Sequence, residues 1–249
     1  MPGCGQHRSY RRCVPRSAVA VLVAVLVALT GCTFEWQIED AAEPPIAPVG
    51  QGDVPAGTLD PAAASAALAG LQVAEKTSLD GYERGCGEGE GCAFGPAWAD
   101  VDRNGCDQRN DVLHRDLTDV EVREGTQGCV VIAGVLDDPY TGETVEFVKA
   151  EAAEVPIDHV VPLAAAWVQG AAEWPAEQRQ AFANDLTNLI ATTRSTNSAK
   201  GDSTADEWTP PAKDYGCSYA TVVVTVKSAY ALAVTPAESE ALRSLLATC

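Results

Sequence analysis

Residues 155–163 read Val-Pro-Ile-Asp-His-Val-Val-Pro-Leu, and this stretch decides how the rest of the chain is interpreted. An acid beside a histidine, inside an apolar run of β-branched residues, is typical of the end of a short, half-buried strand. The carboxylate of Asp158 is a hard oxygen ligand, and an imidazole such as that of His159 is suited to proton transfer near neutral pH. The stretch therefore predicts a candidate active site where a strand ends.

Polar residues follow this stretch at characteristic intervals. Asn188 opens a second strand-like run, residues 188–193, and Asn197 and Lys200 lie within residues 195–202. In this order, with an acid–histidine pair, an asparagine and then Asn-x-x-Lys, the chain resembles HNH endonucleases.

The resemblance is strongest to secreted actinobacterial proteins of the HNH type, and it covers roughly residues 75–249. It rests on four sequence blocks: Ile157–Ala164, Ala181–Leu189, Asn197–Asp202 and Glu207–Pro211. It implies an α+β fold with a ββα-metal (HNH-like) core at about residues 144–205, additional strands and C-terminal helices. The chain departs from the pattern in two places. Asn197 stands where many HNH proteins have a last histidine, and Ser198-Ala199 stand where relatives often have an arginine, which implies weaker phosphate contact.

The resemblance also implies roles for the matching residues. Asp158 and Asn197 would bind a single Mg²⁺ or Mn²⁺ ion through oxygen. His159 would be the general base, and Asn188 would fix the strand pair or orient the imidazole. Lys200 would contact a phosphate oxygen. The alternative is a purely structural role, in which the histidine is buried in the core with its hydrogen bonds satisfied and the asparagines cap local structure.

The first 31 residues have a different composition. Four arginines precede Ala18–Leu29, an apolar segment of twelve residues. Twelve residues are too few to span a bilayer and fit a signal peptide. Leu29-Thr30-Gly31-Cys32 resembles a bacterial lipobox, so Cys32 is predicted to be lipidated and to anchor the protein to the outer face of the membrane. The alternative is an ordinary signal peptide and a secreted protein.

Residues 32–65 are rich in proline, alanine and glycine and are predicted to form a tether. Residues 66–249 are then expected to form one domain. The alanine-rich run from Pro61 to Val73 favours a helix near this boundary.

The charge balance argues against an ordinary nucleic-acid-binding protein. The chain has 17 basic and 35 acidic residues, and removal of a leader with four arginines and no acids would leave a net charge of −22. Binding to nucleic acid gains most of its affinity from basic side chains that neutralise phosphates. We therefore expect the protein to bind nucleic acid weakly, at a local positive site and in a salt-sensitive way. We also expect it to be a monomer.

The chain has nine cysteines, of which two lie in the leader and one in the lipobox. The six that remain in an exported domain predict disulfides, and the absence of a Cys-x-x-Cys motif disfavours a zinc ribbon. Pairing of sequence neighbours encloses the shortest loops. It predicts the bridges Cys86–Cys92, Cys106–Cys129 and Cys217–Cys249.

A second possible cation site lies in the stretch from Asp100 to Asp111. Asp100, Asp102, Asn104 and Gly105 have the spacing of a calcium loop, with Asp111 in place of the usual final glutamate. Calcium at this loop is the cofactor alternative.

Arg109 lies within the same stretch and has two interpretations. It could clamp a phosphate with Asp107 holding it in place, or it could form a surface salt bridge. His114, at helical spacing after Asn110, is expected to be structural or exposed.

Propensity and turn residues predict the regular elements. Residues 221–226 read as a strand by propensity, whereas the resemblance implies a helix. The remaining expectations are strands at 129–136, 144–148 and 188–193, a turn at 138–142, and helices at 163–169, 175–184, from 195 and from 236 to about 247 after a Thr235 cap.

The sequence thus predicts an exported, metal-dependent HNH-type endonuclease that hydrolyses phosphodiester bonds. Two alternatives stay open: an acidic calcium-binding surface lipoprotein, and a catalytically degenerate HNH fold with a structural role. The choice between DNA and RNA is also open.

Overall fold

The computed structural model describes residues 54–249. The predicted leader, the lipobox with Cys32 and most of the predicted tether lie outside the described residues. Within residues 54–249, no helix is long and apolar enough to cross a membrane.

The described residues form a mixed α and β structure with two small sheets. The strands are β1 (Leu117–Val122), β2 (Val131–Asp137), β3 (Thr144–Val148), β4 (Ile157–His159) and β5 (Leu189–Ala191). The helices are α1 (Pro61–Gly70), α2 (Gln108–Asp116), α3 (Leu163–Val168), α4 (Ala176–Ala183), α5 (Arg194–Lys200), α6 (Gly216–Ala229) and α7 (Pro236–Leu246).

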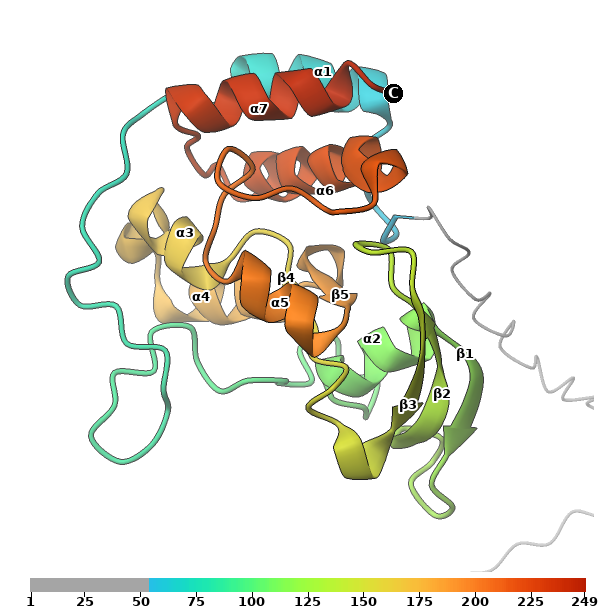
Figure 1. The fold of residues 1–249 in the computed structure, drawn as a ribbon. Helices are drawn as coiled ribbons and strands as arrows, with labels where there is room; N and C mark the ends of the chain where they lie inside the picture. Colours follow the sequence, from blue (N-terminus) through green and yellow to red (C-terminus); the bar gives the residue numbers. More distant parts are fainter. Residues whose placement is uncertain (1–53) are drawn as a thin grey trace, which may run out of the picture. The chain divides into compact units, whose positions relative to one another are not determined.

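The strand pair β4–β5 lies at the centre of the fold, with α5 beside it (Figure 1). The two strands are antiparallel, and His159 pairs with Leu189. Helices α3 and α4 lie between these strands in the chain, and α5 follows β5 directly. The predicted order of strand, two helices, strand and helix is confirmed.

The second sheet has the order β1-β2-β3 and carries α2 (Figure 1). The β2–β3 hairpin was predicted from the turn residues between its strands, and it is confirmed. Strand β1 was not predicted. Its pairing with β2 has register shifts around Asp119, which has a φ of 50°. These irregularities break the alternation of apolar and polar residues by which a strand is recognised.

Helices α1, α6 and α7 lie together at one end of the molecule (Figure 1). The valine-rich part of α6 is helical. The resemblance implied this helix, whereas propensity had indicated a strand. Residues 219–227 of α6 are all buried, so tertiary packing on every side of the helix outweighs the weak preference of valine for strands. Thr235 caps α7 by accepting a hydrogen bond from the amide of Glu238, as predicted.

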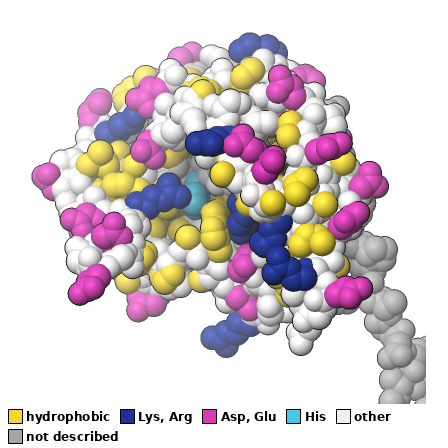
Figure 2. All heavy atoms as spheres, turned by 60° about the horizontal axis from the view of Figure 1, so that its bottom comes forward, with side chains coloured by type: hydrophobic (Ala, Val, Ile, Leu, Met, Phe, Trp, Pro, Cys, Tyr) yellow, Lys and Arg dark blue, Asp and Glu magenta, His cyan; other side chains and the backbone are white. Residues whose placement is uncertain are grey.

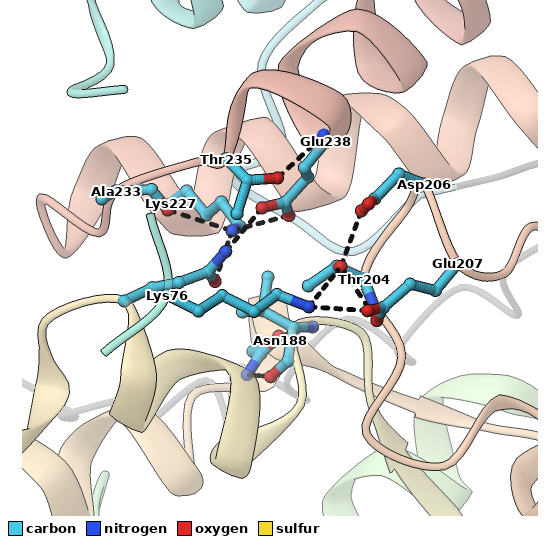
Figure 3. A network of polar contacts seen from close by, with 11 residues as sticks. Lys76, Asn188, Thr204, Asp206, Glu207, Lys227, Ala233, Thr235 and Glu238 are labelled. Carbon is cyan, nitrogen blue, oxygen red and sulfur yellow. Dashed lines mark hydrogen bonds and ion pairs between the residues drawn. The ribbon is translucent and has the colours of Figure 1, made fainter. Parts of the chain in front are cut away.

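A buried polar network joins α6 and α7 to the end of α3 (Figure 3). Lys227 Nζ lies 2.6 Å from Glu238 Oε1 and also donates to Gln169 Oε1 and to the carbonyl of Ala233. Gln169 donates in turn to Glu238 Oε2. The network therefore links α6, α7 and the end of α3.

The folded domain begins earlier than residue 66, where the sequence placed the end of the tether. The amide of Leu59 donates to Thr225 Oγ1 of α6, and Ala64 and Leu68 of α1 are buried against the core. The helix predicted from Pro61 is present as α1, capped by Asp60, so the folded part includes residues that the predicted boundary had assigned to the tether.

All three predicted disulfides are present: Cys86–Cys92, Cys106–Cys129 and Cys217–Cys249. The first closes a small loop beside the site described next, and the third ties the last residue to the start of α6.

Candidate active site

Strand β4 sends its two polar side chains to opposite faces, because alternate residues of a strand point in opposite directions. Asp158 points toward Tyr140 and Lys200, whereas His159 points toward Trp98 and the end of α4. Both are almost fully buried, with exposed fractions of 5% and 8%. One short strand thus presents an acid and an imidazole in different surroundings.

Asp158 forms a buried ion pair with Lys200. Lys200 Nζ lies 3.0 Å from Oδ1 and 2.9 Å from Oδ2, and the hydroxyl of Tyr140 donates to Oδ2 at 2.9 Å. Burial raises the pKa of Asp158, and the ammonium of Lys200 opposes that rise. The ion pair therefore stabilises the ionised carboxylate of Asp158 in the protein interior, where an isolated charge would be strongly disfavoured.

The position of Lys200 corrects its predicted role as a phosphate contact. Its side chain is inaccessible to solvent, and its third contact is the carbonyl oxygen of His159 at 2.7 Å. Lys200 therefore holds the backbone and the carboxylate of β4. In the sequence Lys200 lies one helical turn after Asn197, and nothing in this position indicates that the side chain is buried.

His159 is held as a neutral imidazole. Burial, with Arg84 and Lys200 adding to it, lowers the pKa of His159 to about 3, although the bond to Ala183 opposes the shift. The Nε2 atom lies 2.8 Å from the carbonyl oxygen of Ala183, so Nε2 carries the proton of the neutral ring. This leaves the lone pair of Nδ1 free to accept a proton.

Asn188 clamps the turn that follows β4. Its Oδ1 accepts a hydrogen bond from the amide of Val161, its Nδ2 donates to the carbonyl of Val161, and its own carbonyl accepts from Val160. The side chain is completely buried. Of the two predicted roles, the geometry favours fixing the strand pair over direct contact with the imidazole.

A polar pocket of about 220 Å³ brings the central predicted residues together. Asp158, His159 and Asn197 line it, along with Arg84 and Asp202. Figure 2 shows a histidine at the bottom of a hollow, with basic and hydrophobic side chains around it. Residues from β4 and α5, nearly forty positions apart in the sequence, therefore converge on one cavity.

A second, largely apolar pocket of about 300 Å³ adjoins the first. His159, Arg84 and Leu163 line both pockets, and Trp98 and Phe94 line the second. The Trp98 ring lies nearly parallel to the imidazole, at a centroid distance of 6.3 Å and an interplanar angle of 13°.

Arg84 and Trp98 were not identified from the sequence. Arg84 is exposed, directly precedes the loop closed by Cys86–Cys92, and lines both pockets. A useful signal was present: an arginine in a strongly acidic chain, next to a small disulfide loop. The position of Trp98 depends on chain folding between residues distant in sequence, which no local pattern reports.

Arg109 forms no ion pair at salt-bridge distance among residues 54–249, so the predicted surface salt bridge is not formed. Its Nη2 donates to the carbonyl oxygens of Ala152 and Val155, which fixes the segment just before β4. Asp107 instead caps α2 by accepting from the amide of Asn110. Partial burial lowers the pKa of Arg109. Arg109 therefore holds the segment that leads into β4, and its contact with a phosphate stays a prediction.

The candidate calcium loop satisfies many of its polar groups internally. Asn104 Nδ2 donates to Asp102 Oδ2 and to Asp111 Oδ1, while the amide of Gly105 donates to Asp100 Oδ2. Asp111 Oδ2 is buried without a partner, and burial raises the pKa of Asp111. Across residues 54–249 no group of three His, Cys, Asp or Glu side chains is arranged to hold a metal ion. Calcium binding here stays a prediction.

The residues of the polar pocket can be compared with the ligands that Mg²⁺ prefers. Mg²⁺ retains several waters and commonly uses only one or two protein carboxylates. Asp158 and Asn197, which both line the pocket, have one carboxylate and one amide oxygen, a donor set that fits a hydrated, hard divalent cation. Lys200 already neutralises the carboxylate, so such a cation would compete with an ammonium group and would be held weakly.

This architecture defines a disulfide-bonded α and β domain with a buried acid–histidine–lysine centre under a pocket. Residues 107–245 match the family of GmrSD restriction endonucleases, C-terminal domain, and the chain belongs to that family. An uncharacterized secreted protein of Arthroderma benhamiae is 44% identical over 188 residues, which are 75% of this chain and 84% of that relative. That relative is fungal, so the actinobacterial part of the resemblance is not supported. No solved structure matches the chain significantly.

Proposed function

We propose that the protein is an exported, metal-dependent endonuclease of the HNH type that hydrolyses phosphodiester bonds in nucleic acid. The observation that carries this proposal is the convergence of His159, Asp158 and Asn197 on one pocket. The family name, which refers to restriction endonucleases, supports a nuclease-related activity. The strand–strand–helix arrangement of β4, β5 and α5 supports assignment of the core as ββα-metal.

His159 is the general base in this proposal. A water molecule attacks phosphorus while Nδ1 of His159 takes its proton, and the bond from phosphorus to the leaving sugar oxygen breaks. The products are a phosphate monoester and a sugar alkoxide, which takes a proton from solvent water to become the alcohol. The lowered pKa keeps His159 unprotonated at the start but makes it a reluctant acceptor. A bound phosphodiester brings negative charge close to the ring, which favours the imidazolium.

Asp158 and Asn197 are the proposed ligands of Mg²⁺ or Mn²⁺ on the pocket wall. A divalent cation there supplies charge stabilisation for the phosphate and the leaving oxygen. Lys200 and Tyr140 hold the carboxylate in place, and Asn188 holds the backbone beyond His159. These contacts pre-organise the centre before substrate arrives.

Arg84 is the proposed phosphate contact. It is the exposed basic residue that lines the polar pocket, whereas Lys200 is buried and Arg109 is engaged with backbone carbonyls. The net charge of the chain is −18, so attraction to phosphate depends on this local cation and on bound metal. Substrate binding is therefore weak and sensitive to salt.

Export is part of the proposal. The related Arthroderma benhamiae protein carries the description secreted, and three disulfides fit an oxidising compartment. Lipidation of Cys32 is the finer proposal. Cys32→Ser should move the protein from the detergent phase to the medium. An unmodified N-terminus on soluble wild-type protein would contradict the anchor.

A plasmid-nicking assay tests the proposed activity. Wild-type protein should nick the plasmid with Mg²⁺ or Mn²⁺, and a chelator should abolish nicking. Asn197→Ala should weaken metal binding, so an excess of metal should partly restore its rate. The matched control is Asn104→Ala in the candidate calcium loop, which should leave the metal requirement of nicking unchanged. Metal-independent nicking, or no cleavage of DNA or RNA under any metal condition, would overturn the proposal.

A further inference from the structure

The geometry points to the apolar pocket beside His159 as a binding site for an unpaired nucleobase of the substrate, which makes single-stranded nucleic acid the preferred substrate. This inference rests on the proposed function and goes on to name its substrate class. Its basis is the pair of adjoining pockets, which share His159, Arg84 and Leu163 but differ in polarity.

The wall of the apolar pocket suits a flat ring. Trp98 and Phe94 contribute aromatic side chains, and Leu163 and Ala183 contribute aliphatic ones. Phe94 is almost completely buried and forms a fixed wall, whereas Trp98 is partly exposed. Unpaired bases bind proteins by stacking on aromatic side chains of this kind.

Trp98 is held in place at some cost. It has a φ of 60°, a left-handed conformation that is unfavourable for a bulky residue. The next residue, Ala99, donates its amide to Asn184 Oδ1 at the end of α4, and Asn184 is buried. Strained residues that the surroundings hold in place are concentrated at ligand sites.

The neighbouring polar pocket identifies the occupant. A nucleotide joins a planar base to a phosphodiester, and the two pockets place an apolar wall next to a cation and a proton acceptor. Arg84 lies at both pockets, so a phosphate at Arg84 and His159 would have its attached base at Trp98. A free apolar metabolite would satisfy only one of the two pockets.

The charge of the protein disfavours an intact duplex. A duplex binder gains affinity from many phosphate contacts, and this chain has a net charge of −18. A base inside a duplex must also be unstacked and unpaired before it can enter a pocket, which an already single strand avoids. Stacking is an alternative source of affinity that needs few basic residues.

Binding measurements with the full exported chain in chelator test this inference without cleavage. The probes are a labelled single-stranded oligonucleotide, its duplex, and the same single strand with abasic positions that keep every phosphate. We expect the intact single strand to bind more tightly than both others. Trp98→Leu should lose roughly 5- to 150-fold in affinity for the intact strand and should bind the abasic strand as wild type does.

Two variants make this test specific. Trp98→Phe keeps a ring at the same backbone position and should retain most of the preference for intact strand. Trp174→Leu makes the same change in a tryptophan that packs against Phe182 and Tyr230 and lines neither pocket, so it should keep wild-type affinity. Thermal unfolding checks that each variant is folded.

The outcomes separate this inference from the proposed function. Equal affinity of wild-type protein for intact and abasic strands, or tighter binding of the duplex, overturns the base pocket even if metal-dependent cleavage is observed. Absence of cleavage with every metal overturns the proposed function, whatever the binding preference. Base-dependent binding that Trp98→Leu removes, together with faster cleavage of single strands, supports both.

Discussion

Two buried lysine–carboxylate pairs, Lys227–Glu238 and Lys200–Asp158, have almost the same chemistry and different surroundings. Lys227 and Glu238 are sealed among three helices, and Gln169 bonds both partners. Lys200 is equally buried, but Asp158 lines a pocket and is followed by His159. Burial lowers the pKa of Lys227 and raises that of Asp158, and in each pair the partner charge opposes the shift. A buried ion pair is therefore no sign of function by itself, and the pocket beside Asp158 is what distinguishes the proposed active site.

Breaking each pair separates structure from activity and should give the largest effects on stability. Lys227→Met and Lys200→Met should each reduce the free energy of unfolding by about 3–5 kcal/mol, because each leaves a buried carboxylate unpaired. Denaturant unfolding measures this loss. Only Lys200→Met should also slow cleavage per folded molecule, by about 10²-fold, because it releases Asp158 and the backbone of His159. Equal activity of the two variants would contradict the distinction.

Two buried asparagines sharpen the comparison at smaller cost. Asn188→Ala leaves the amide of Val161 without its acceptor, and Asn110→Ala does the same to the amide of Val131. Each should cost about 1–3 kcal/mol in unfolding free energy. Cleavage should fall only for Asn188→Ala, since Asn188 fixes the turn after His159. A matching loss of activity in Asn110→Ala would indicate general destabilisation instead.

The third effect is a dependence of stability on pH. The pKa of His159 is about 3 in the folded protein, below its usual 6.5, so the unfolded chain binds more protons between these values. Above about pH 6.5 the imidazole is neutral in both states and does not lower the free energy of unfolding. As the pH falls from about 6.5 toward about 3, the free energy of unfolding decreases by up to ~1.4 kcal/mol per pH unit because of this group. Chemical denaturation in chelator should show this slope, and His159→Gln should reduce it. Identical slopes for both proteins would contradict the neutral buried imidazole.

The residues that could be predicted from the sequence are those with local patterns. The Asp158-His159 strand, the β2–β3 hairpin and the capped helix α7 follow from periodicity and turn chemistry, and the disulfides follow from neighbour pairing. Asn197, singled out by its interval along the motif, lines the polar pocket, and its role as a metal ligand stays a prediction. Conversely, the burial of Lys200 and the engagement of Arg109 with Ala152 and Val155 depend on chain folding, because exposed and buried cations look alike in sequence.

The proton acceptor is the centre of this account, and two histidines with similar local bonding allow it to be tested. Nε2 of His159 bonds the carbonyl of Ala183 inside the pocket, and Nε2 of His114 bonds the carbonyl of Gly128 at a more exposed position. The measurement is the single-turnover rate of nucleic-acid cleavage at saturating metal for wild type, His159→Ala and His114→Ala. The account predicts a loss of about 10²–10⁴-fold for His159→Ala, which added metal does not restore, and a wild-type rate for His114→Ala. A wild-type rate for folded His159→Ala would contradict the account.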